Sequence, residues 1–246
     1  MNLKIHNLLI NSSILSLPGI LSIFLSLLSI PVHLSIAGTE NYGNYIIFHF
    51  LLIISSILNL GIGKSIAVSV NNHPTKNREI GYQGIKYTFN VIIIILPLLI
   101  ILLHSKQLSS ISKLIDHTLI SYFLFGIVLT ILYSSLEGIF QGNQMFKFLS
   151  FFNFIFFSLS LSLPSITLLI DKDLSLGDLV IFSIIIKFFT IVLMFLFIKS
   201  KNLILGSKNQ ILFLNLKKNA RWLTLNSVLT HFYDLLDKYL VKIFLG

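Results

Sequence analysis

A lysine in the middle of an apolar run is the residue of this sequence that most directly indicates chemistry. Lys187, in "IFSIIIKFFTIVL", lies roughly nine residues, or ~13 Å of helix, from either end of its run. A lysine stem does not comfortably reach water over that distance. An ionisable group in hydrocarbon costs several kcal/mol unless it faces protein or a wet cavity. We predict that Lys187 faces a cavity; the alternatives are a structural ion pair and a displaced span boundary.

A second lysine, Lys64, lies in "LGIGKSIAV", near the inner end of another apolar run. From there its ammonium could reach the membrane interface, so an interfacial role and a functional role are both open. Gly63-Lys64-Ser65 matches the end of a phosphate-binding loop, but Leu58 stands where that pattern needs a glycine. The stretch also lies in a membrane span rather than between a strand and a soluble helix, which argues against an ATPase.

Polar side chains follow one face of the last apolar run. They recur at helical spacing, at Ser227, Thr230, His231, Asp234, Lys238 and Lys242. A helix of this kind lines a water-filled path better than it faces lipid. Asp234 and Lys238 are also four residues apart in the acid-first order, so they alternatively neutralise each other. Both interpretations place the pair on the inward face.

The remaining residues give little indication of an enzyme. The chain has no cysteine, which excludes disulfides and thiolate metal sites, and its seven histidines are scattered without a metal-ligand or hydrolase motif. A membrane glycosyltransferase or polymerase would need acidic residues in long outer loops, and the longest outer connection is only about ten residues. We therefore expect neither an enzyme nor a bound cofactor or metal.

The elements that position these residues are membrane helices. The composition is 55% hydrophobic and 11% charged, with a mean hydropathy of +0.90. Continuous runs of the roughly 20 apolar residues that a helix needs to cross a bilayer recur along the chain, whereas a barrel would show short alternating strands. We predict seven spans, kinked at Pro18, Pro31, Pro97 and Pro164, over residues 8–36, 45–70, 87–104, 114–136, 148–170, 179–198 and 222–245.

The distribution of basic residues predicts the orientation. With the N-terminus in the cytoplasm, the cytoplasmic side receives eleven basic residues: Lys4, Lys76, Arg78, Lys86, Lys147, Lys199, Lys201, Lys208, Lys217, Lys218 and Arg221. The outer side then receives only three: Lys106, Lys113 and Lys172. Most of the net charge of +9 is then a topogenic signal. Nucleic acid is not an expected partner.

The turn between the first two predicted spans carries a family pattern. "IPVHLSIAGTENYGNYIIF" resembles the first outer turn of bacterial polysaccharide (O-antigen) flippases, in the multidrug/oligosaccharidyl-lipid/polysaccharide exporter superfamily. The matching residues are Gly38, Tyr42, Gly43 and Tyr45. Glycines permit a tight turn, and tyrosines suit the membrane interface.

Three further stretches are similar to the same family. "SILNLGIGKSIAVSV" resembles its glycine-containing second-helix end, although Lys64 stands where a small or hydroxylic residue is expected. "LEGIFQGNQMFKFLSFFN" resembles the inner loop between helices four and five. "YDLLDKYLVKIFLG" resembles helix seven, with Asp237-Lys238 as the match. The order and spacing of these stretches agree with the family over essentially the whole chain.

The resemblance implies an architecture and a function. Family members have two homologous six-helix lobes around a central cavity, so we expect a six-span first lobe over residues 1–221 and the first span of a second lobe over 222–246. "IFLG" corresponds to the start of the next outer turn, which suggests a fragment of a longer protein. The implied function is to flip undecaprenyl-pyrophosphate-linked oligosaccharide across the bacterial plasma membrane. Its expected partners are this lipid-linked oligosaccharide, the bilayer and polysaccharide polymerase machinery.

The resemblance also suggests which residues line the substrate pathway: Lys64, Lys187, His231, Asp234, Asp237 and Lys238. Cationic groups there would offset the charge of a diphosphate inside a hydrated cavity. The alternatives are a drug or cation antiporter of the same superfamily, a membrane polysaccharide polymerase, a seven-span receptor and an inactive fragment. The Tyr-Gly turn and the Asp-Lys end of the last span favour the polysaccharide branch over the antiporter.

Overall fold

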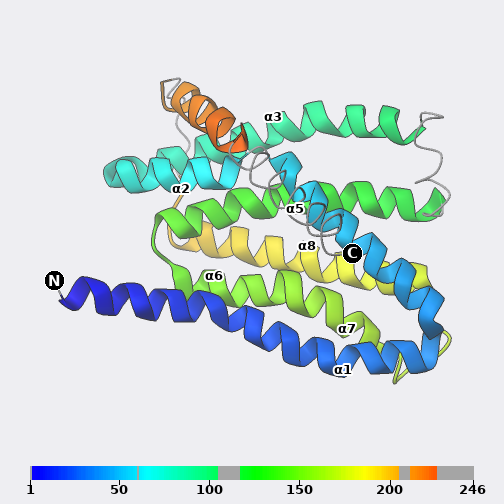
Figure 1. The fold of residues 1–246 in the computed structure, drawn as a ribbon. Coiled ribbons are helices and arrows are strands. Elements are labelled where there is room, and N and C mark those ends of the chain that lie inside the picture. Colours follow the sequence, from blue (N-terminus) through cyan, green and yellow to red (C-terminus); the bar gives the residue numbers. More distant parts are fainter. Residues whose placement is uncertain (1, 60, 105–116, 205–210, 226–246) are drawn as a thin grey trace, which may run out of the picture.

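Every regular element that the computed structural model describes, over residues 2–59, 61–104, 117–204 and 211–225, is a helix (Figure 1). The elements are α1 (Asn2–Ser55), η1 (Ser56–Asn59), α2 (Ile62–Asn72), η2 (Pro74–Lys76), α3 (Asn77–His104), α5 (His117–Gly142), α6 (Phe146–Asn153), the π-helical η4 (Phe154–Leu159), α7 (Ser160–Thr167) and α8 (Leu176–Ser200). A further helix covers residues 211–225.

Five stretches within these helices are long and apolar enough to cross a membrane: Ser16–Ile53, Pro74–Ile101, Leu119–Gly142, Phe146–Thr167 and Leu176–Ser200. Many of their large apolar side chains are exposed on the surface of the bundle, as lipid-facing helices require. The chain is therefore an all-α polytopic membrane protein, which confirms the predicted fold class.

The first two predicted spans meet at Gly38, inside α1. This element has 54 residues, ~80 Å if it were straight, against a hydrocarbon core of ~30 Å. Gly38 breaks it with φ 81° and ψ 170°, a conformation that favours glycine. The chain reverses direction there, and the second arm of α1 runs back at an angle to the first arm (Figure 1). The predicted turn is confirmed at Gly38, whereas Gly43 lies in regular helix with open space around it and needs no glycine.

The second predicted span is not one continuous helix. Its first part is the second arm of α1, and its second part is α2, separated by η1 and by Gly61 in the left-handed conformation with φ 62°. The Asn59 side chain bridges this break, because its Oδ1 accepts from the Gly61 amide (3.1 Å) and its Nδ2 donates to Ser134 Oγ (3.1 Å). Lys64 consequently lies in the first turn of a separate short helix.

Helix α2 packs directly against the backbone of α5. A Cβ on Gly138 would overlap the Gly63 carbonyl, and a Cβ on Gly63 would overlap the Ser134 carbonyl. One turn further on, a Cβ on Gly142 would lie 2.6 Å from the Cβ of Val70. Small residues spaced four apart on α5 therefore allow the close approach that packs helices in a membrane, where lipid supplies no hydrophobic drive between helices.

The connections separate into two ends of the bundle. The α2–α3 and α5–α6 turns lie at the same end as the N-terminus, and the Gly38 turn and the α7–α8 turn lie at the other (Figure 1). This arrangement matches the grouping of loops that the basic residues predict. Helix 211–225, predicted as a loop up to residue 221, packs on α2 through a hydrogen bond from Ser65 Oγ to the Leu216 carbonyl (2.9 Å). The predicted boundary at 221/222 thus falls inside a helix, and the seventh span lies largely outside the described residues.

The Gly63–Gly138 contact gives the first prediction. Gly138→Ala places a methyl group against the Gly63 carbonyl, so α2 and α5 must separate, at a cost of about 1–3 kcal/mol of stability. The melting temperature of the detergent-purified protein should fall. Gly19→Ala is the matched control, because no atom lies within 4 Å of its added Cβ and alanine is the better helix former. Equal melting temperatures for the two variants would contradict the contact.

Candidate functional site

Lys187 is buried at the centre of α8. Its side chain is only 5% exposed, and it shares one buried face of the helix with Ser183, Ile184, Thr190 and Met194. A capping box sets the start of the helix, where Ser175 Oγ accepts from the Asp178 amide (3.3 Å) and Asp178 Oδ2 accepts from the Ser175 amide (3.0 Å). The midpoint position removes the alternative that the span boundary is displaced.

The Lys187 ammonium faces an aromatic ring. Its Nζ lies 5.3 Å from the centroid of Phe156, within the range at which a cation is attracted to a ring face. Phe156 belongs to the π-helical η4 and stacks on Tyr133 with ring centroids 3.9 Å apart. The Tyr133 hydroxyl in turn donates to Asn153 Oδ1. In the described part of the chain, Lys187 has no carboxylate partner, so the alternative of a structural ion pair finds no support there.

A histidine completes the surroundings of Lys187. His49, on the second arm of α1, is 6% exposed, and its Nε2 lies 3.3 Å from Ser183 Oγ, one helical turn before Lys187. The buried lysine therefore contacts an aromatic ring, with Ser183 one turn before it on the same helix face and His49 beside Ser183. The imidazole and the hydroxyl are groups that can bind an anion together with an ammonium.

The aromatic and imidazole contacts continue from His49 towards the Gly38 turn. The Tyr45 ring lies 4.6 Å from the His49 ring and 5.3 Å from the His33 ring, between centroids. His33, on the first arm of α1, is fully buried, and its Nδ1 lies 2.8 Å from Ser165 Oγ on α7. The two arms of α1 thus meet α7 and α8 through polar groups, which we call the buried polar core: His33, Tyr45, His49, Ser165, Ser183 and Lys187.

Tyr45 compensates for a proline in the neighbouring span. Pro164 has no N–H to donate to the Ser160 carbonyl four residues earlier. The Tyr45 hydroxyl donates to the Leu161 carbonyl (2.9 Å) and lies 3.4 Å from the Ser160 carbonyl. The structure therefore places Tyr45, at 0% exposure, in the interior, and not at the interface as its place in the turn motif suggests. Tyr42 in the same motif is half-buried, with its ring 5.1 Å from that of His33.

A small cavity lies beside this hydrogen bond. It has a volume of about 30 Å³ and is lined by Ser26, Ser29, Ile30, Tyr42, Tyr45, Ile46, Leu161 and Ser165. Although three serines are among its lining residues, the surface of this cavity is mostly apolar. A buried water needs two or more polar partners. The cavity is therefore a packing gap beside the buried polar core and not a water site.

The structure separates the two predicted intramembrane lysines. Lys64 is exposed on α2, and its charge acts on Glu137 of α5, whose Oε1 accepts from Gln141 Nε2 (3.0 Å). Lys64 therefore belongs to a polar group on the α2–α5 pair, apart from the Lys187 surroundings. The remaining predicted pathway residues lie outside the described part of the chain: His231, Asp234, Asp237 and Lys238.

Sequence reasoning missed the residues that surround Lys187. His33 and His49 were counted only among scattered histidines, although Tyr45 and His49 are four apart and share a helix face. A buried histidine in an apolar run is the same kind of signal as a buried lysine. Among the described residues, no three or more His, Asp or Glu side chains form a group that could hold a metal.

Comparison of the chain with protein-family models, with curated proteins and with solved structures finds no match. The function is therefore argued from the residues of the site and from the sequence pattern.

Tyr45 provides the prediction for this site. Tyr45→Phe keeps the ring contacts but removes the hydroxyl that reaches the Leu161 and Ser160 carbonyls, and Pro164 offers the Ser160 carbonyl no N–H, so we expect a loss of about 1–3 kcal/mol and a lower melting temperature. Tyr82→Phe, on the exposed face of α3, should leave the melting temperature unchanged. In a Pro164→Ala background, which restores an N–H to the helix, the cost of Tyr45→Phe should shrink. An undiminished cost would show that Tyr45 does not compensate for the proline.

Proposed function

We propose that this protein moves an undecaprenyl-pyrophosphate-linked oligosaccharide, an O-antigen or capsule repeat unit, from the inner to the outer leaflet of a bacterial plasma membrane. One observation carries the proposal: Lys187 is buried at the midpoint of a membrane helix without an acidic partner in the described part of the chain. An ionisable residue placed this way is retained at a cost, which favours a functional role. The family pattern from the Gly38 turn onwards supplies the substrate class.

The pyrophosphate of such a substrate determines what the site must do. A diphosphate cannot cross hydrocarbon without compensation of its charge. The Lys187 ammonium supplies a positive charge in the middle of the bundle, and Ser183 and His49 supply hydrogen-bonding groups within one turn of it. Contact with the Phe156 ring holds the ammonium in place without neutralising it. When a diphosphate binds, the Lys187 ammonium would leave the Phe156 ring and pair with the diphosphate, which is the stronger partner.

Transport also requires the bundle to open. The polyprenyl tail would remain in lipid, while the head group passes between α8 and the second arm of α1, whose polar side chains face each other at His49 and Ser183. Rocking of one helical unit against another would alternate access between the leaflets. The bend at Gly38 and the π-helical η4 are the natural points for this movement, since kinks and π-bulges are where helices depart from rigid geometry.

A drug or cation antiporter of the same superfamily is the second candidate. The observation that favours it is the pair of buried imidazoles, His33 and His49, which are groups able to take up and release a proton. An antiporter would export drugs or small cations and leave surface polysaccharide unchanged. The two candidates are therefore separated by the substrate that accumulates when the gene is deleted.

Lys187→Met tests the proposed function directly. We expect surface polysaccharide to fall by about tenfold or more, because several kcal/mol of charge compensation are lost and ~1.4 kcal/mol is a factor of ten. The melting temperature should stay equal or rise, since a buried charge without an acidic partner is removed. Lys187→Arg should keep part of the export. Lys199→Met, exposed in the last turn of α8, is the control; normal polysaccharide in Lys187→Met would remove Lys187 from the mechanism.

The proposed orientation has its own test. The chain has no cysteine, so single cysteines can be introduced at Lys147, after the α5–α6 turn, and at Asp173, in the α7–α8 turn, both exposed. With the N-terminus in the cytoplasm, a membrane-impermeant maleimide should label the residue at 173 in intact spheroplasts and the residue at 147 only after permeabilisation. The reverse pattern would overturn this orientation.

A further inference from the structure

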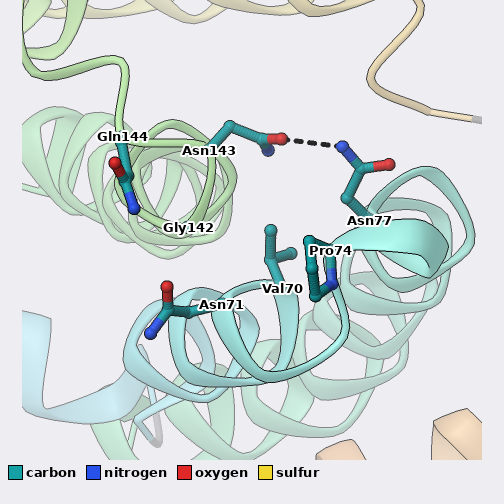
Figure 2. Close-up of a pocket in the computed structure, with 7 residues that line it drawn as sticks. All are labelled: Val70, Asn71, Pro74, Asn77, Gly142, Asn143 and Gln144. Carbon is teal, nitrogen blue, oxygen red and sulfur yellow. Dashed lines mark hydrogen bonds between the residues drawn. The ribbon is translucent and has the colours of Figure 1, made fainter.

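A second hollow lies at the end of the bundle where the α2–α3 and α5–α6 turns meet (Figure 2). We call it the amide pocket. It has a volume of about 220 Å³ and is lined by Val70, Asn71, Pro74, Asn77, Gly142, Asn143 and Gln144. The pocket is separate from the buried polar core and plays no part in the charge compensation proposed for Lys187.

The pocket is lined by carboxamides and not by charges. Asn71, Asn77, Asn143 and Gln144 contribute four of the seven lining residues, and none of the seven is titratable. Each carboxamide offers both donors and an acceptor. The complementary ligand is therefore neutral and carries groups that both donate and accept hydrogen bonds, as hydroxyls do.

The helix ends around the pocket do not favour an anion either. Helices α3 and α6 begin there and present the positive ends of their dipoles, but α2 and α5 end there and present the negative ends. The opposing partial charges largely offset each other. The sharp turn between α5 and α6 is closed by backbone hydrogen bonds from Gln144 to the Gln141 carbonyl (3.0 Å) and from Met145 to the Phe140 carbonyl (2.9 Å).

One wall of the pocket is held in a fixed orientation. Asn77 Nδ2 donates to Asn143 Oδ1 (2.9 Å), and Asn143 Nδ2 donates to the Ile139 carbonyl (2.8 Å). This chain links the start of α3 to the end of α5. Gln144 has a left-handed backbone with φ 58° and also lines the pocket. The Asn77–Asn143 side of the pocket is thus pre-organised.

The rest of the pocket is apolar. Figure 2 shows Val70 pointing between the two turns, with the Asn71 and Gln144 carboxamides on one side and the Asn77–Asn143 pair on the other. Pro74 adds a second apolar surface. A sugar ring has the matching chemistry, because its C–H faces are apolar and its rim carries hydroxyls. The volume is below the ~300 Å³ at which pockets for drug-sized ligands begin, so it fits one ring rather than an oligosaccharide.

We propose that the amide pocket binds one neutral sugar ring of the transported oligosaccharide, at the inner end of the bundle. This inference rests on the proposed function. The pocket would hold the glycan of a substrate on the side from which it is loaded, while the lipid tail remains in the membrane. The Asn77–Asn143 pair recognises the ring edge, and Asn71 and Gln144 supply exchangeable hydrogen bonds.

Saturation-transfer difference NMR on the full chain in nanodiscs tests the pocket. The probes are glucose, galactose and N-acetylglucosamine at millimolar concentration, with inorganic phosphate as a competitor. At least one sugar should give a signal, and Asn71→Ala and Asn143→Ala should each reduce it about fivefold or more. Asn71→Ala removes an exposed side chain and is the variant that should fold normally. The control is Asn90→Ala, exposed along α3 outside the pocket.

Three results would overturn the inference: no signal from any of the three sugars, a signal that neither pocket variant reduces, or displacement of the sugar by phosphate. The last result would identify an anion site. The Lys187→Met polysaccharide assay reports on the proposed function separately. Loss of export in Lys187→Met without sugar binding to the wild type would leave the transport proposal standing and remove the pocket. Sugar binding with normal export in Lys187→Met would leave the pocket standing and remove Lys187 from the mechanism.

Discussion

The backbone contact between α2 and α5 is the constraint on which much of the bundle depends. Gly63 and Gly138 leave no room for a Cβ on either helix, so the two backbones touch. The same approach brings the α2–α3 turn within hydrogen-bonding distance of the α5–α6 turn, where Asn77 meets Asn143. It also allows the second span to be broken at Gly61 without losing its place in the bundle, because α2 is held by α5 and not by continuity with α1.

The interior of the remaining helices follows a different rule. In place of close backbone contacts, the two arms of α1 meet α7 and α8 through His33, Tyr45, His49 and their partners. Hydrogen bonds hold these groups together where lipid offers no hydrophobic drive. These side chains also donate hydrogen bonds to backbone carbonyls next to irregular helical turns, as Tyr45 does near Pro164. Side-chain hydrogen bonds thus join α1 to α7 and α8, whereas close backbone packing joins α2 to α5.

The sequence predicted some of these features for clear physical reasons. Apolar runs indicate membrane helices, because length and composition alone decide whether a segment can span the bilayer. Lys187 could be identified because a charge is rare and costly in such a run. Gly38 could be placed at a turn from the glycine and its flanking pattern. In each case one local property was sufficient.

Other features were missed because they depend on contacts between distant segments. The interior place of Tyr45 follows from Pro164, more than a hundred residues later in the chain, and His33 is significant only because Ser165 faces it. The break at Gly61 was hidden by apolar residues on both sides. The amide pocket forms only when two turns meet, so neither turn signals it alone. Lys64 lies in an apolar run of the sequence, as Lys187 does. Its side chain is nevertheless exposed, because α2 places it at the surface near Glu137.

The π-helical turn in the fifth span has a consequence for how this protein can change over evolutionary time. A π turn accommodates one more residue than an α-helix of the same length. Deleting a single residue from Phe154–Leu159 would therefore restore a regular α-helix of the same length, and the residues that follow would keep their faces. Ser165 would stay opposite His33, and the change would be confined to the turn that places Phe156 beside Lys187. One-residue insertions and deletions in this segment are thus changes to compare among related chains, because they act on the ring that faces the lysine.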